Sequence, residues 1–267
     1  MEASASVEDY LKTVWRLSSP PDGGSDGRVA PSELARALGV SAPSVSAMAR
    51  RLRLAGLLVD TPAGTPLELT PDGARTALDV VRRHRLLETF LVQVLGLGWD
   101  EVHAEAEVLE HALTPRVERA IAAHLGEPAR DPHGDPIPPP SELLAPGVLA
   151  PGAVVRSDHR EDWGQPLAAA DADAVFDVER VEDVDPTVLR HLADLGIIPG
   201  TRLHLAGRDD HGGPLWVRVC SPGGECSPGG ESDRVPLGAG LVRRVHGRTA
   251  PAGAQRGSST GVPTGST

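Results

Sequence analysis

The sequence contains little cysteine. Its two cysteines, Cys220 and Cys226, lie in a segment where Cys-Ser-Pro-Gly-Gly-Glu occurs twice in succession. A metal-binding pair is one interpretation, but a duplicated Pro/Gly turn in a hairpin loop is favoured because no second pair of ligands lies nearby. We therefore assign these cysteines no function.

Long hydrophobic runs are also missing, and we expect no signal peptide. No stretch reaches the length of about 18 apolar residues that a membrane-spanning helix needs. The opening Met1-Glu2-Ala3-Ser4 lacks the basic and then apolar order of a secretory signal. At 267 residues with 40% hydrophobic content, the chain can bury a core in each of two or three domains. We expect a cytoplasmic protein with no membrane partner.

The net charge of −11 argues against nucleic acid as a partner, but the charge is unevenly distributed. Between Arg28 and Arg85 there are nine arginines and five acidic residues. A basic segment within an acidic chain indicates a nucleic-acid-binding module.

Histidine and acidic residues recur at helical spacing between residues 84 and 111. Positions i, i+3 and i+4 of a helix share one face. Six residues follow this spacing: His84, Glu88, His103, Glu107, Glu110 and His111. The pattern is typical of a metal site, although an exposed acidic helix face with scattered histidines is the alternative. Imidazole and carboxylate groups without cysteine argue against a thiolate zinc or iron–sulfur site and leave Mn(II), Fe(II) and Zn(II) as candidates.

Residues 31–54 predict a helix-turn-helix. A short amphipathic helix at 31–38 is followed by a tight turn at Gly39, and Ser41 can cap a second helix that continues to about residue 54. In this motif the second helix enters the major groove of DNA.

The rest of the chain changes from helical to β patterning. The expected elements are helices at 7–17, 70–94, 99–113, 114–125 and 186–195, and strands at 57–60, 67–70, 175–181, 202–206, 215–219 and 240–245. The first two strands would form a wing beside the helix-turn-helix, and the later ones suggest a small barrel resembling an SH3 fold. The helices after residue 70 carry more apolar positions than one small domain needs, so we expect a dimer interface.

In these motifs and their order, the chain resembles the diphtheria toxin repressor family of metal-dependent transcriptional regulators, and within it the three-domain manganese transport regulators. The stretches that carry the resemblance are Glu8-Asp9-Tyr10-Leu11, Ser41 to Ser46, Arg82 to Glu88, Val102 to His111 and Asp131 to Pro138. The resemblance implies a fold that is mainly α with a small β domain. The implied parts are a winged helix-turn-helix domain at 1–75, a helical metal-binding and dimerisation domain at 76–140, a linker at 141–151, an SH3-like or FeoA-like domain at 152–247 and a disordered tail at 248–267.

The resemblance also implies two metal positions. The primary, activating site would comprise Asp9, Glu107, Glu110 and His111. The ancillary site would comprise His84, Glu88 and His103, with Asp185 of the third domain as a further acid. Val188, which cannot ligate a metal, stands where iron-type members have a glutamine.

The identity of two ligands bears on the choice of metal. Iron-type members have Met and Cys where this chain has Asp9 and Glu107, and replacing two sulfur ligands with carboxylates favours Mn(II) over Fe(II). Zn(II) or Co(II) are expected to substitute in vitro. Lys12 stands where short two-domain manganese regulators have a Glu, so their closely spaced binuclear arrangement is not expected here.

The resemblance implies a double-stranded DNA operator and a second copy of the chain as partners. The expected DNA-contacting residues are Ser41, Pro43, Ser44, Ala47, Arg50 and Arg51, of which the arginines would contact phosphates and the others lie where family members approach base edges. We predict a manganese-responsive repressor of metal-uptake genes that binds palindromic operators as a homodimer when Mn(II) is bound. An iron-dependent regulator of the same family is the alternative.

Two other functional classes are less favoured. A metal-dependent hydrolase would need an open coordination position and a substrate cleft, whereas one ligand here belongs to a helix beside a helix-turn-helix. A metal buffer or an adaptor that binds proline-rich peptides is the third class. We therefore expect no enzyme activity, no catalytic residues and no small organic substrate.

Overall fold

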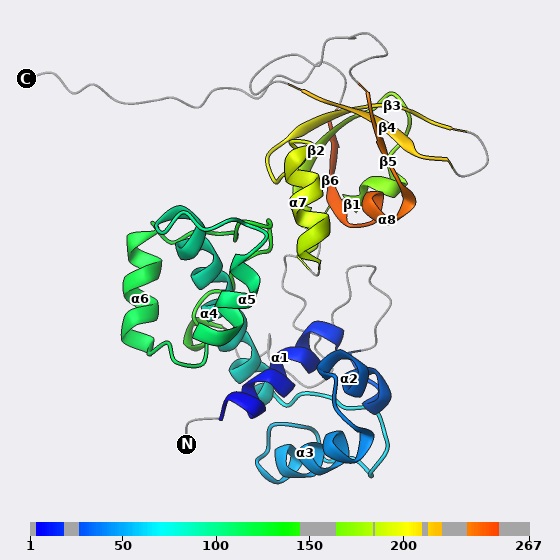
Figure 1. Cartoon of the computed structure of the whole chain (residues 1–267). Coiled ribbons are helices and arrows are strands. Elements are labelled where there is room, and N and C mark those ends of the chain that lie inside the picture. Colours follow the sequence, from blue (N-terminus) through cyan, green and yellow to red (C-terminus); the bar gives the residue numbers. More distant parts are fainter. Residues whose placement is uncertain are drawn as a thin grey trace, which may run out of the picture. The chain divides into compact units, whose positions relative to one another are not determined.

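The computed structural model describes residues 4–18, 27–144, 164–183, 185–209, 213–220 and 234–250. The chain divides into two compact units, Met1–Trp163 and Gly164–Thr267, and each is described by itself (Figure 1). Cys226, most of the predicted linker and the tail beyond residue 250 lie outside the described residues.

The first unit is helical. Its helices are α1 (Ala5–Ser18), α2 (Pro31–Leu38), α3 (Ala42–Leu54), α4 (Pro71–Gln93), α5 (Val102–Leu109), α6 (Pro115–His124) and the short 3-10 helix η1 (Ser141–Leu143). Helices α2 and α3 form the predicted helix-turn-helix. Gly39 adopts a left-handed conformation with φ 64° between them, and the Ser41 side chain accepts a hydrogen bond from the Ser44 backbone N–H.

The wing is smaller than the sequence predicts. Two isolated antiparallel bridges, Val29 to Leu67 and Leu58 to Leu69, take the place of the predicted strands. Leu58 and Leu67 of these bridges are buried with Leu34 and Leu52 of the helix-turn-helix and with residues of α1 in one hydrophobic core, against which the partly buried Leu69 packs. Helix α1 and the helix-turn-helix therefore form one packed body.

Helix α4 joins this body to the rest of the unit. Thr70 caps its first turn by accepting a hydrogen bond from the Gly73 N–H, and Pro71 occupies the first turn. A side chain at Gly73 would collide with the Leu57 carbonyl, so glycine allows α4 to pack closely against the wing. Helix α4 also contacts α1, α5 and α6.

The helices α5 and α6 are shorter than predicted. Helix α5 begins at Val102 and ends at Leu109, where the sequence predicted 99–113. Thr114, which precedes Pro115 and caps α6, has extended backbone geometry, so the helical path is broken before α6. Leu86, Ala106 and Ile121 belong to the core between α4, α5 and α6.

The second unit is an antiparallel sheet with helices packed beside it. The sheet order is β1-β6-β2-β3-β4-β5. Its elements are β1 (Gln165–Pro166), η4 (Leu167–Ala169), β2 (Val175–Val181), α7 (Pro186–Asp194), β3 (Arg202–Arg208), β4 (Leu215–Val219), β5 (Val235–Leu237), α8 (Ala239–Val242) and β6 (Val245–Ala250). Phe176 of β2 pairs with Leu203 of β3, and Leu205 of β3 pairs with Val217 of β4. All four side chains are buried, and because side chains alternate along a strand, they lie on the buried face of the sheet.

One predicted strand is wrong in this unit. The sequence predicted a strand at 240–245, but residues 239–242 form α8, in which the Leu241 and Val242 N–H groups donate to the Gly238 carbonyl. The strand β6 begins at Val245 and extends to Ala250, three residues beyond the predicted domain boundary at 247. The fold class of a mainly helical protein with a small β domain is confirmed. No helix among the described residues has both the length and the apolar character needed to cross a bilayer.

Candidate metal centre and DNA-binding surface

Three helices of the first unit, with the residues directly after α5, bring together seven of the eight predicted metal ligands. Asp9 lies on α1, His84 and Glu88 lie on α4, and His103 and Glu107 lie on α5. Glu110 and His111 follow the last residue of α5 directly. Because α4 contacts both α1 and α5, residues far apart in the sequence converge on one region.

The first group comprises Asp9, Glu110 and His111. Their candidate ligand atoms all lie within 4.8 Å of one another. The His111 Nε2 atom is 2.9 Å from Asp9 Oδ1 and 3.6 Å from Glu110 Oε1. Burial raises the pKa of Asp9, against the opposing effect of His111. Two carboxylates and one imidazole can thus reach a common cation.

Glu107 borders this group but lies nearer to the histidines of α4 and α5. It forms a second group with His84 and Glu110, and its Oε1 atom is 3.6 Å from His103 Nε2. Burial acts to raise the pKa of Glu107, but the Lys12 ammonium together with His84 and His103 outweighs burial and lowers the pKa. Glu110 is therefore shared between the Asp9 and Glu107 sides of the region.

Two residues that the sequence did not single out as site residues complete this region. Glu8 Oε2 is 2.6 Å from His111 Nδ1, and Glu8 Oε1 accepts a hydrogen bond of 2.8 Å from Arg83. The Lys12 ammonium donates to Glu107 and to Glu110, each at 2.7 Å. Lys12 follows Asp9 by three residues and Glu8 by four, so helical spacing could have placed Lys12 on the side of α1 that carries both acids.

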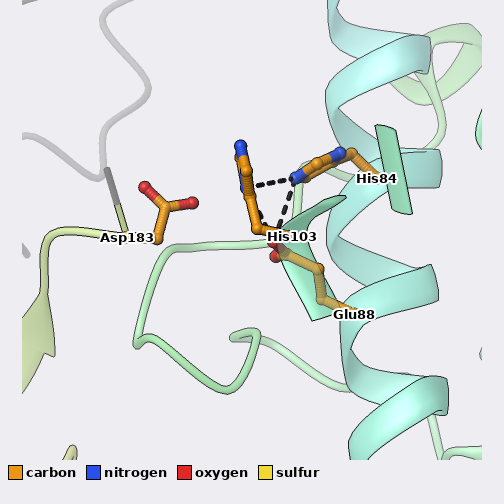
Figure 2. Close-up of side chains that lie close together, drawn as sticks. All are labelled: His84, Glu88, His103 and Asp183. Atoms are coloured by element: carbon orange, nitrogen blue, oxygen red, sulfur yellow. Dashed lines mark hydrogen bonds and ion pairs between the residues drawn. The ribbon is translucent and has the colours of Figure 1, made fainter. Parts of the chain in front are cut away.

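His84, Glu88 and His103 form a compact group of their own (Figure 2). The Oε1 atom of Glu88 is 3.0 Å from His84 Nε2 and 3.1 Å from His103 Nδ1, and the two histidine rings meet edge to face. Burial acts to lower the pKa of His84, but Glu88 and Glu110 outweigh it and raise this pKa to about 9. His84 Nδ1 lies 2.6 Å from Glu110 Oε2, so this group is hydrogen-bonded to the first.

A fourth group was missed by the sequence reasoning. Glu88, Asp131 and His133 are all buried and offer ligand atoms within 4.8 Å of one another. His133 lies in a turn, but it is fully buried and stacks on Trp99. Burial and the nearby Asp135 and Glu88 carboxylates raise the pKa of Asp131 well above its ordinary value. Glu88 of α4 and this loop are distant in the sequence and meet only through tertiary packing, so residue spacing could not have indicated this group.

Asp185 has a local structural role within the second unit. Its Oδ1 atom accepts a hydrogen bond from the Thr187 N–H at the start of α7, and its Oδ2 atom is 3.8 Å from Arg244. Asp185 caps the start of α7, and this capping explains why an aspartate occurs at this position.

The donor chemistry of the first unit fits a divalent cation. All the side chains in the four groups offer oxygen or nitrogen, and none offers sulfur. The Lys12 ammonium also shows that the Glu107 and Glu110 carboxylates accept a cation between them. Hard oxygen ligands with imidazole suit Mn(II), Fe(II) or Zn(II).

The predicted DNA-contacting residues lie on one exposed side of the helix-turn-helix. The exposed residues are Ser41, Pro43, Ser44, Ala47, Arg50 and Arg51, whereas Val45, Ala49 and Leu52 are buried. The Arg53 side chain, in contrast, donates to Thr61 at the wing. Helix α3 thus packs through one face and presents the other to solvent, as a major-groove helix must.

Comparisons with known proteins agree with this arrangement. Residues 2–64 match the iron dependent repressor N-terminal DNA binding domain, residues 70–139 match the iron dependent repressor metal binding and dimerisation domain, and residues 165–248 match the FeoA domain. The iron-dependent repressor IdeR of Mycobacterium leprae is 35% identical over 198 residues, which cover 74% of this chain and 82% of the relative. The chain belongs to the diphtheria toxin repressor family. It is thus a metal-dependent DNA-binding repressor with a FeoA domain and not an enzyme.

Relatives of this family differ in the metals that their names specify. The diphtheria toxin repressor of Corynebacterium diphtheriae is 30% identical over 205 residues, which cover 77% of this chain and 86% of the relative. A solved manganese-dependent transcriptional repressor in complex with manganese is 37% identical with a TM-score of 0.70, and the match covers 91% of this chain and 100% of that one. ScaR with bound Cd2+ is 27% identical with a TM-score of 0.65, and the match covers 90% of this chain and 98% of that one.

Proposed function

We propose that this family member is a manganese-responsive repressor in which Asp9, Glu107, Glu110 and His111 form the activating metal site. The observation that carries the proposal is that Asp9 on α1 and Glu110 and His111 after α5 offer ligand atoms within 4.8 Å of one another. Glu107 is joined to Glu110 through the Lys12 ammonium, and none of the four residues offers sulfur. Mn(II) depends less on sulfur ligands than the later divalent metals do, so an all-oxygen-and-nitrogen set favours it. His84, Glu88 and His103 are proposed as the ancillary site.

The connection between the site and the DNA-binding surface runs through α1. Val7, Tyr10 and Leu11 of α1 are buried in the same core as Val45 and Leu52 of α3. Asp9 of this helix would therefore move together with α3, while Glu110 and His111 would move together with α5. A divalent cation held by all of them supplies positive charge that offsets the repulsion between the carboxylates. Together these ligands would fix α3 relative to α4 and α5.

A fixed α3 matters because the family's dimerisation domain implies a homodimer. Two recognition helices must lie about 34 Å apart to enter successive major grooves on one side of DNA. Apolar side chains that could cover a subunit interface are exposed on the second half of this unit: Val94, Leu95, Val108, Leu109 and Val117. If the recognition helices of the dimer also adopt other separations, the apparent affinity for DNA falls in proportion to the fraction of dimers that have the correct separation.

The test is metal-dependent binding to duplex DNA. A duplex enriched from a random-sequence pool by the protein in Mn(II) would be labelled, and its binding followed by fluorescence anisotropy at one stated salt concentration with Mn(II), Fe(II), Co(II) or Zn(II). We expect the strongest activation by Mn(II) at metal concentrations that exist in cells. The same duplex with scrambled half-sites is the control. Binding that is independent of metal would contradict the proposal.

An iron-dependent repressor is the second candidate, because the 35% identical mycobacterial relative carries that name. The same titration separates the two candidates. Activation by Fe(II) under anaerobic conditions at lower concentrations than Mn(II) would favour the iron-dependent alternative.

A further inference from the structure

Lys12 is the only lysine in the sequence, and it is partly buried among acidic residues. Lysine and arginine together number 26, and Lys12 is the sole lysine among them. Its side chain is only 15% exposed, and its ammonium lies 2.7 Å from both Glu107 Oε1 and Glu110 Oε1. The one compact ammonium of the chain thus lies between two carboxylates of the proposed primary site.

Helix geometry accounts for this placement. Lys12 follows Asp9 by three residues on α1, so both side chains leave the helix on the same face, toward the residues around the end of α5. A lysine ammonium is a compact point charge, whereas an arginine guanidinium is a broad planar fork. A distance of 2.7 Å to each carboxylate is that of a strong, charge-assisted hydrogen bond. Lys12 therefore acts as a counterion where the ligand carboxylates would otherwise repel each other.

Resting on the function proposed above, we propose that Lys12 is a built-in competitor of the activating metal, which holds Glu107 and Glu110 in the metal-free protein and raises the Mn(II) concentration at which the site fills. Two physical effects act in this direction. The carboxylate oxygens that accept hydrogen bonds from the ammonium are the same atoms that would ligate the cation. The positive charge of Lys12 also repels a divalent cation at short range.

A purely structural role for Lys12 predicts the opposite result. If the ion pairs only dock α1 onto α5, removing them would displace Asp9 and weaken metal binding. Competition instead predicts that removing the ammonium strengthens metal binding, because α1 remains packed through Val7, Leu11 and Val14. The sign of the change in affinity therefore separates the two roles.

The first experiment measures Mn(II) binding to the full chain by isothermal titration calorimetry. In Lys12→Met we expect the Kd to fall about tenfold, equivalent to about 1.4 kcal/mol. Arg16→Met is the matched control, since it removes one positive charge from an exposed position on the same helix and should leave the Kd unchanged. Adding Asp9→Asn to Lys12→Met should abolish the gain, which assigns it to the primary site.

Circular dichroism would show whether Lys12→Met folds. If Lys12→Met does not fold, the same titration is made with Lys12→Gln, whose amide can still donate to Glu107 and Glu110 but has no charge. An unchanged or higher Kd in the folded neutral variant overturns the inference.

The second experiment uses the fact that the chain has one lysine. Protein labelled with [ε-13C]lysine gives a single side-chain ε signal in NMR, which can be followed while diamagnetic Zn(II) is added. We expect this signal to shift as Zn(II) saturates the site, because the ammonium leaves its carboxylate partners. An unshifted signal at Zn(II) saturation overturns the inference. A wild-type chain that binds no Mn(II) would overturn the proposed function itself, whereas normal binding with no gain in the Lys12 variants overturns this inference alone.

Discussion

Glu8 and His111 are joined by a contact of 2.6 Å between the carboxylate Oε2 atom and the imidazole Nδ1 atom. The second oxygen of Glu8 accepts a hydrogen bond from Arg83 at 2.8 Å, which holds the carboxylate in place. When Nδ1 donates its proton to Glu8, the lone pair of His111 lies on Nε2, the atom that is 2.9 Å from Asp9. Glu8 thus orients a proposed ligand without belonging to the ligand set.

The first prediction concerns this orienting role. Glu8→Gln should weaken Mn(II) binding by about 10- to 100-fold, the range found when the outer partner of a ligating histidine is removed. Calorimetric titration with Mn(II) would measure the change. Glu105→Gln, at an exposed position on α5, is the matched control and should behave like the wild type. Equal affinities for Glu8→Gln and Glu105→Gln would show that Glu8 does not act through His111.

Much of the helical unit could be predicted because its signals are local. Gly39 and Ser41 mark the turn and the cap of the helix-turn-helix within a few residues of each other. The start of α4 is marked in the same way by Thr70 and Pro71. Such signals depend on backbone geometry and nearest neighbours, which the sequence contains directly. The start of the longest helix followed from these signals, whereas the fold class was implied by the family resemblance.

Other features depend on contacts between distant segments. The burial of His133 beside Glu88 depends on how the loop after α6 packs against α4, and no spacing rule contains that information. The ion pairs of Lys12 join residues that are 95 and 98 positions apart. The short helix α8 was mistaken for a strand because a four-residue helix has too few turns to show helical periodicity.

The second prediction concerns Glu110, which is fully buried and contacts both His84 and Lys12. Glu110→Gln keeps the size of the side chain but removes a charged ligand, so we expect Mn(II)-activated DNA binding to weaken by more than about 100-fold, beyond the range for outer-shell residues. Anisotropy titrations with the enriched duplex would measure this. Sedimentation should still show a folded dimer. Wild-type metal activation of this variant would remove Glu110 from the ligand set.

The third prediction concerns the exposed arginines of α3. Arg50→Ala and Arg51→Ala should each weaken binding to all duplex sequences about equally, and each should reduce the slope of log K against log salt concentration by about 1 if the residue contacts a phosphate. Arg119→Ala, exposed on α6, is the matched loss of charge and should not change the slope. If the loss of affinity instead differed between duplex sequences, the arginine would contact the edge of a base rather than a phosphate.

The fourth prediction concerns pH. The carboxylates of Glu88 and Glu110 raise the pKa of His84 to about 9, so His84 is protonated in the metal-free protein at neutral pH. A metal ion that binds His84 must displace this proton, so binding should release protons and weaken as the pH falls below about 9. Titrations with Zn(II) in buffers of different ionisation enthalpy would count the released protons. His84→Gln should release fewer protons, and an equal release from this variant would show that His84 does not take part.

The fifth prediction concerns the choice of metal. Asp9→Met combined with Glu107→Cys should shift activation from Mn(II) toward Co(II) and Fe(II), because both changes replace a hard oxygen donor with softer sulfur. Asp9→Met also removes one negative charge, on which Mn(II) depends more strongly because its bonding to carboxylates is mainly electrostatic, whereas a metal-bound cysteine is a thiolate and keeps the charge. Anaerobic anisotropy titrations with each metal would give the ratio of Mn(II) to Co(II) activation constants. Asp9→Asn is the control for the loss of that charge without sulfur, and it should weaken activation by both metals. An unchanged ratio in the Met/Cys variant would mean that selectivity is determined elsewhere in the chain.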